Sequence, residues 1–282
     1  MPTRIISFAG NSLALDYEGK AAAEIIDILY RHLPADPTFD PHLTYCLISG
    51  QSSPQLRLWR EDVSLYHGQN RAVAAELLLG DSCYHLAAHS QNGLLFHAAA
   101  LSWQGQGLIL PGVSGSGKTT LTAWLLGQGF DYLTDELVFI PWQTNSIQTF
   151  TRPLNLKRPA RTILQNQIDW ARHEGQLLSS DTADLVPPHL LTQTDPAGQA
   201  NLRLILFPCY RSDAPFELRP LSKAQTGLAL MQNLINARNL PQQGFSEVAR
   251  LTTHAISAYQ LTYADFAQIE RHLDHFIDLL TT

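Results

Sequence analysis

A glycine-rich segment near the middle of the chain has the residue types and spacing of a phosphate-binding loop. It fits the pattern G-x-x-x-x-G-K-[ST] at every fixed position. Its residues are Gly112, Val113, Ser114, Gly115, Ser116, Gly117, Lys118 and Thr119, with Thr120 directly after them. Glycines let a backbone curl with its N–H groups pointing inward, a lysine can bridge the outer phosphates, and a hydroxyl can bind Mg²⁺. The segment predicts a nucleotide site, with Lys118 on the phosphates and Thr119 on the metal.

Two adjacent carboxylates, Asp135 and Glu136, follow Lys118 by 17 and 18 residues. One helix and one turn fill this interval, so we expect the pair beside the loop, at the sheet edge where ligands bind. Neighbouring residues of an extended chain point to opposite sides. One carboxylate would then reach the metal, while the other accepts a proton from a hydroxyl that receives the phosphoryl group. Spacing alone also allows a solvent-exposed turn.

A single histidine, His97, stands in the apolar run LLFHAAAL just before the loop. A histidine in such a run is commonly a core residue with satisfied hydrogen bonds. However, the runs LLFHAAALSW and GLILPG are joined by Gln104-Gly105-Gln106-Gly107 and together predict a β-hairpin that leads into the loop. The hairpin would bring His97 next to the phosphate site.

The remaining elements follow from hydrophobic periodicity and from glycine and proline positions. In the first third, helices are expected over 21–33 and 71–88, with strands over 42–48, 56–60 and 63–68. After the loop we expect a helix over 119–128, extended chain over 130–140, strands over 202–210 and 216–221, and helices over 223–237, 247–258 and 264–280. The polar stretch 169–199, broken by Pro187-Pro188, is expected to be a mobile loop or a plain surface excursion.

Length and composition limit the classes of protein to consider. The 282 residues, 45% of them hydrophobic, favour two domains with buried cores, which we place at 1–91 and 92–282. A formal charge of −6 gives no field that favours nucleic acid. The start of the chain lacks a signal peptide and no stretch is long enough for a membrane span, so we expect a cytoplasmic protein with no membrane partner. The three scattered cysteines, Cys46, Cys83 and Cys209, are expected to be free thiols.

Taken in order, FHAAAL, the hairpin, GVSGSGKTT, the short helix and LTDELVFI resemble the nucleotide-binding domain of HPr kinase/phosphorylase, and more closely the bacterial HPr-kinase-related proteins. RPLNLK, LRLILFPCY and ELRPLS extend the resemblance, which covers about residues 92–225. It implies an α/β fold: a P-loop domain related to phosphoenolpyruvate carboxykinase, preceded here by a small α+β domain. It also implies ATP and Mg²⁺ as cofactors.

The resemblance also implies a role for each site residue. Lys118 and Thr119 correspond to the loop lysine and the metal-binding hydroxyl, Asp135 to the base, Glu136 to the metal-side acid and His97 to the histidine before the loop. A cationic residue of the family matches Arg152 or Lys157 only loosely. The enzyme itself has Asp-Asp where this chain has Asp-Glu, which puts the phosphorylase activity and the HPr substrate in question.

These features predict an ATP-dependent kinase of a hydroxyl, with a serine of a peptide or small protein as acceptor. A kinase of a small hydroxyl metabolite would share the whole site, and a non-catalytic ATP-binding switch would need only the loop. The sequence leaves open whether the chain forms a homo-oligomer.

Overall fold

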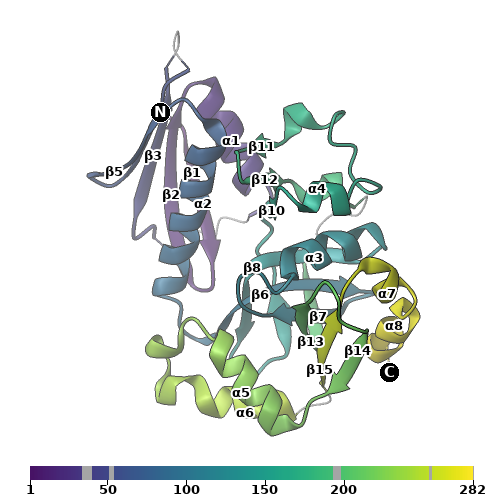
Figure 1. Ribbon diagram of the computed structural model, residues 1–282. Helices are drawn as coiled ribbons and strands as arrows, with labels where there is room; N and C mark the ends of the chain where they lie inside the picture. The colour runs from purple at the N-terminus through teal and green to yellow at the C-terminus, as the bar shows by residue number, and fades with distance from the viewer. Residues whose placement is uncertain (34–39, 51–53, 193–197, 254–255, 282) are drawn as a thin grey trace. The chain divides into compact units, whose positions relative to one another are not determined.

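The structure is a computed structural model that describes residues 1–33, 40–50, 54–192, 198–253 and 256–281. The chain divides into two compact units, each with its own sheets (Figure 1). The first unit comprises Met1–Ser90 and Thr151–Leu190, and the second comprises Gln91–Phe150 and Leu191–Thr282. Residues 151–190 were expected in the second domain and instead belong to the first unit.

The first unit is built on a five-stranded sheet in the order β1-β2-β3-β4-β5. Its strands are β1 (Thr3–Phe8), β2 (Asn11–Glu18), β3 (Thr44–Ser49), β4 (Leu56–Arg60) and β5 (Val63–Gly68). Two helices, α1 (Lys20–Tyr30) and α2 (Arg71–Ala88), contact each other and the sheet (Figure 1). The side chain of Asn70 caps the first turn of α2 by accepting hydrogen bonds from two backbone N–H groups, which explains why the helix begins there.

Residues 151–190 form short elements of their own rather than one long loop. Their three-stranded sheet has the order β10-β12-β11, from β10 (Leu154–Lys157), β11 (Leu178–Ser179) and β12 (Ala183–Val186). The short helices are α4 (Ala160–Ile163), η1 (Glu174–Gln176) and η2 (Pro188–Leu190). Ser180 Oγ donates a hydrogen bond to Glu76 on α2, which ties the segment to the first unit. The loop expected over 169–199 is thus partly wrong, and its residues 193–197 lie outside the described chain.

The second unit contains a seven-stranded sheet in the order β14-β15-β13-β7-β6-β8-β9. The strands are β6 (Gly93–Trp103), β7 (Gln106–Pro111), β8 (Asp131–Pro141), β9 (Ser146–Gln148), β13 (Gln199–Tyr210), β14 (Glu217–Pro220) and β15 (Ser257–Tyr263). β7, β13 and β15 run parallel, and β6 pairs antiparallel with both β7 and β8. Hence β7, β8, β13 and β15 all point the same way, and the segments that follow β7, β13 and β15 meet at one edge of the sheet.

Helices cover both faces of this sheet. α5 (Lys223–Asn233) and α6 (Phe245–Thr253) lie on one face, and α3 (Lys118–Gly127) lies on the other (Figure 1). α7 (Phe266–Glu270) contacts β15, and α8 (Leu273–Thr281) contacts β7 and β13. The helix expected over 264–280 is therefore two helices. The helix expected over 247–258 is α6, which ends at Thr253, and β15 begins at Ser257.

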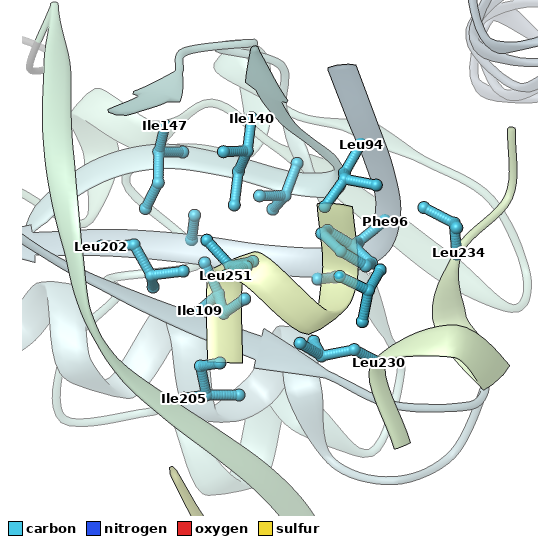
Figure 2. Close-up of a cluster of buried hydrophobic side chains, with 14 of the residues drawn as sticks. Leu94, Phe96, Ile109, Ile140, Ile147, Leu202, Ile205, Leu230, Leu234 and Leu251 are labelled. Atoms are coloured by element: carbon cyan, nitrogen blue, oxygen red, sulfur yellow. The ribbon is translucent and has the colours of Figure 1, made fainter. Parts of the chain in front are cut away.

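A buried apolar cluster joins the sheet to α5 and α6. Figure 2 shows side chains from the sheet facing side chains from these helices, among them Leu230 and Leu251. On β6 the cluster takes alternate residues, Leu94, Phe96, Ala98 and Ala100. Because side chains alternate along a strand, His97 points to the opposite face, the one that α3 covers. His97 thus lies on the α3 side of β6, away from the apolar cluster.

Candidate functional site

The predicted loop connects β7 directly to α3. The hairpin before it is confirmed: Trp103 pairs with Gln106, and both residues of the turn, Gln104 and Gly105, have positive φ, as a tight turn between twisted strands requires. Within the loop, Gly115 and Gly117 have φ of 86° and 96°. These left-handed conformations suit glycine, and they curl the chain immediately before the first turn of α3.

The lysine of the loop is buried. Lys118 is 6% exposed, and its Nζ donates a hydrogen bond to the carbonyl oxygen of Gly112, 2.6 Å away, across the curl of the loop. Burial lowers the pKa of Lys118 from its usual value, while the nearby carboxylates of Asp135 and Glu136 act in the opposite direction. The positive charge is thus partly withdrawn from water and faces negative neighbours.

Both carboxylates lie at the level of the loop. In the sheet, Pro111 on β7 and Glu136 on β8 both pair with Ala98 of β6, so the three residues form one row across the strands. Asp135 is 1% exposed, and its Oδ1 accepts a hydrogen bond from the Thr119 hydroxyl at 3.3 Å. Thr119 and Asp135, 16 residues apart in the sequence, are therefore in direct contact in the folded unit.

Glu136 departs from regular strand geometry. Alternation would send its side chain to the face of its partner Ala98, into the apolar cluster. Its φ is instead 123°, a strained conformation for a residue with a side chain, which costs about 1–3 kcal/mol and is typical of functional sites. The Glu136 carboxylate lies 2.9 Å from His97 Nε2, on the α3 face, and its side chain is 43% exposed.

The predicted division between the two acids is therefore not the one the geometry favours. The resemblance implies Asp135 on the acceptor side and Glu136 on the metal side, and the expectation of two separate roles rests on adjacent residues pointing to opposite sides. In the structure Asp135 is the carboxylate that touches Thr119, and Glu136 is the one that reaches solvent. The positive φ of Glu136 invalidates the premise, because it brings both acids to the α3 face.

His97 lies between Glu136 and Lys118. Its Nε2 is 2.9 Å from Glu136 Oε1 and 3.4 Å from Lys118 Nζ. One ring nitrogen cannot donate to the carboxylate and accept from the lysine at the same time. The shorter contact joins a charged acceptor to a donor, so we assign the proton on Nε2 to the bond with Glu136. His97 thus contacts both Glu136 and the lysine of the loop, next to which the hairpin was expected to bring it.

The oxygen pair of Thr119 and Asp135 fits Mg²⁺. Hard oxygen ligands suit this ion, which commonly takes only one or two groups from the protein and completes its shell with water and phosphate oxygens. Among the described residues there is no group of three or more His, Cys, Asp or Glu side chains that could hold a metal ion. Thr119 and Asp135 could supply the one or two protein ligands that this ion commonly takes.

Several other predicted residues have been placed. Val113 is 72% exposed in the loop, and Thr119 and Thr120 lie in the first turn of α3. Arg152, 6% exposed, and Lys157, exposed on β10, belong to the first unit. Cys46, Cys83 and Cys209 are not joined by disulfide bonds.

Sequence reasoning missed two tyrosines beside the loop. Tyr210 ends β13 and Tyr263 ends β15, the two parallel strands on the far side of β7 from the acids. The Tyr263 hydroxyl lies 2.5 Å from where a Cβ on Gly117 would be. The signal available in the sequence was the aromatic residue at the end of the run LRLILFPCY, which is Tyr210. Its value depends on recognising β15, most of which lies between the helices expected over 247–258 and 264–280.

Comparisons with known proteins add little to this geometry. No described protein family and no curated protein matches the chain. Among solved structures, the HPr(Ser) kinase/phosphatase from Coxiella burnetii is 11% identical over 65% of this chain and 93% of its own length, with a TM-score of 0.30. Because the TM-score is so low, this likeness carries no argument about function. In the described part of the chain, no helix is both long and apolar enough to span a membrane.

Proposed function

We propose that the chain is an ATP-dependent phosphotransferase that moves the γ-phosphate to a hydroxyl, with a serine of a peptide or small protein as the acceptor class. The observation that carries the proposal is the row of Pro111, Ala98 and Glu136, which sets an exposed carboxylate level with a curled loop and its buried lysine. A loop that only retains a nucleotide would not need a second, strained carboxylate at this place.

The loop and its helix supply the phosphate contacts. Backbone N–H groups at the start of α3 favour anions, and Lys118 would exchange its bond to the Gly112 carbonyl for phosphate oxygens. Thr119 and Asp135 would hold Mg²⁺, which neutralises charge on the transferred group when bound. The contribution of these residues is mainly positioning and electrostatic stabilisation.

Glu136 would act as the base on the acceptor side. The acceptor oxygen forms a bond to the γ-phosphorus, the bond from that phosphorus to the bridging oxygen of ADP breaks, and the hydroxyl proton passes to the Glu136 carboxylate. A carboxylate that is 43% exposed can meet an acceptor from solution, whereas Asp135 is enclosed. His97 donates its Nε2 hydrogen to Glu136 and so fixes the direction of the free carboxylate lone pairs.

The test is transfer of label from γ-labelled ATP with Mg²⁺ to a serine-containing peptide library, with a pool of small hydroxyl metabolites as the parallel arm. We expect label in the peptides. Lys118→Ala should abolish transfer and weaken ATP binding at least tenfold, because a charge-assisted hydrogen bond contributes about 1.5–3 kcal/mol. Label in the metabolites alone would mean that the acceptor is a small hydroxyl compound, and the assignment as a phosphotransferase would still hold.

A matched control for Lys118→Ala is Lys223→Ala, which removes an exposed lysine from the first position of α5 in the same unit. The control should bind ATP like the wild type. Equal ATP affinity of Lys118→Ala and the wild type in calorimetry would contradict the phosphate assignment of the loop. Binding without any transfer to either pool would support a switch instead of an enzyme.

A further inference from the structure

The two tyrosines beside the loop form a pair, which we call the aromatic flank: Tyr210 and Tyr263. They are register partners at the ends of the parallel strands β13 and β15. Their ring centroids are 5.8 Å apart at an interplanar angle of 65°, an edge-to-face contact. Tyr263 is 1% exposed, whereas Tyr210 is 47% exposed. One ring is thus buried as support, and the other is presented to solvent.

The aromatic flank is attached to the loop itself. The backbone N–H of Tyr210 donates a hydrogen bond to the carbonyl oxygen of Ser116, 3.2 Å away. A Cβ built on Gly117 would lie 3.2 Å from Tyr210 Cβ and 2.5 Å from the Tyr263 hydroxyl. The loop can pass this closely only because residue 117 is glycine. The exposed ring of Tyr210 is therefore held at a fixed place beside the phosphate-binding loop.

A second aromatic layer stiffens the support. Tyr263 contacts the ring of Phe266 at 5.9 Å, and Phe266 stacks on Trp124 of α3 at 5.2 Å with only 8° between the ring planes. Burial raises the pKa of the Tyr263 hydroxyl, so this group stays uncharged beside a site for anions. A platform held in place before its ligand arrives loses little entropy on binding.

The strand order separates this flank from the acids. The loop strand β7 is central; β6 and β8, with His97, Asp135 and Glu136, lie on one side, and β13 and β15 lie on the other. From β8 to β13 there are three interstrand spacings, roughly 14 Å in all. In phosphoryl transfer the attacking and leaving oxygens are roughly in line. With the acceptor on the acid side, the departing nucleoside diphosphate must extend toward the other side.

Building on the proposed function, we propose that Tyr210 is the stacking platform for the nucleobase of the bound nucleotide and that Tyr263 is its positioning residue. The site would take a nucleobase by contact between ring faces. Such stacking tolerates different bases because each has a π face. Tyr210 would thus add affinity for the nucleoside part of ATP and none for the phosphates.

The test compares two probes by calorimetry, Mg·ATP and magnesium tripolyphosphate, which has the phosphate chain without the nucleoside. Loss of one base–aromatic stack weakens binding roughly 5- to 150-fold. We expect Tyr210→Ala to weaken Mg·ATP binding within this range and to leave tripolyphosphate affinity within twofold. Tyr210→Phe keeps the ring and should match the wild type. Tyr84→Ala, at a 67% exposed tyrosine of α2, is the matched control and should change neither affinity.

Each outcome decides the inference. Equal weakening of both probes by Tyr210→Ala would mean that the residue acts through the loop, and it would overturn the stacking role. Unchanged ATP binding in Tyr210→Ala, with loss of both probes in Lys118→Ala, would place the base elsewhere and leave the proposed function intact. A wild-type chain that binds neither probe would overturn the inference and the proposed function together.

Discussion

The two flanks of the loop on β7 differ in almost every physical respect. The acid side, on β6 and β8, carries ionisable groups, a strained backbone at Glu136 and a carboxylate open to solvent. The aromatic flank, on β13 and β15, carries rings in edge-to-face contact. Under the proposed function, charge at one side would serve proton and phosphoryl transfer, while uncharged rings at the other would suit the part of a nucleotide that does not react. One sheet edge thus provides both environments.

The largest change on the acid side is expected when the charge of Glu136 is removed. Glu136→Gln keeps size and polarity but cannot accept the acceptor's proton, so turnover should fall by about 10²–10⁴, the usual range for loss of a general base. The dissociation constant of Mg·ATP should stay within about threefold. Single-turnover transfer and calorimetry on the same preparation measure the two quantities.

Asp135→Asn is the partner variant for that experiment. We expect it to raise the Mg²⁺ concentration needed for half-maximal rate, because Asp135 contacts the Thr119 hydroxyl. At saturating Mg²⁺ it should recover more activity than Glu136→Gln. The opposite ranking, with Glu136→Gln near the wild-type rate, would return the role of base to Asp135.

The contact between loop and aromatic flank can be broken at Gly117. Gly117→Ala puts a Cβ at a φ of 96° and 2.5 Å from the Tyr263 hydroxyl, so it should lower the free energy of unfolding by roughly 1–3 kcal/mol. Gly115 has a φ of 86° with open space around it, so Gly115→Ala measures the free-energy cost of the backbone conformation alone. Denaturant unfolding should show Gly117→Ala as the more damaging of the two.

Removal of the Tyr263 hydroxyl sharpens this result. In a Tyr263→Phe background, Gly117→Ala should cost less than in the wild type, since the nearest clashing atom is gone. Additive losses in the double variant would mean that the hydroxyl does not press on the loop.

A smaller effect is expected at the metal side. Thr119→Ala removes the hydroxyl that contacts Asp135, and it should weaken Mg·ATP binding roughly two- to tenfold, as for one hydrogen bond. Thr119→Ser keeps the oxygen and should stay within twofold. Binding of ATP in excess chelator should be the same for all three proteins. Similar behaviour of the Ser and Ala variants would exclude Thr119 as a metal ligand.

The sequence was most informative where short-range rules apply. The hairpin, the loop, α3 and the strand with the two acids follow from glycine positions and local periodicity, and the structure confirms these elements. The row that joins Pro111 to Glu136 was predictable in outline, because the chain between loop and acids is long enough for only one helix and a turn.

Long-range and strained features were not predictable in the same way. The grouping of residues 151–190 with the first unit depends on contacts such as Ser180 with Glu76, far apart along the chain. β15 begins only four residues after α6 ends at Thr253, and its first two residues lie within the helix expected over 247–258. The division of roles between Asp135 and Glu136 depends on one positive φ, for which the residue type gives no signal.

The last and smallest expected effect concerns the loop lysine between the two flanks. Its pKa is lowered by burial, so the folded chain carries a charge that would be better solvated in the unfolded chain. Lys118→Met removes this penalty and loses the bond to Gly112, and the net gain in the free energy of unfolding should be roughly 0.5–1 kcal/mol near neutral pH. The gain should shrink as pH rises through the lowered pKa toward the usual lysine value, because the wild-type lysine then becomes neutral in both states. Lys223→Met, at an exposed site, should show no such pH dependence in denaturant melts. A Lys118→Met variant less stable than the wild type at neutral pH would mean that the bonds of Lys118 outweigh its desolvation, and that the loop is not a strained element.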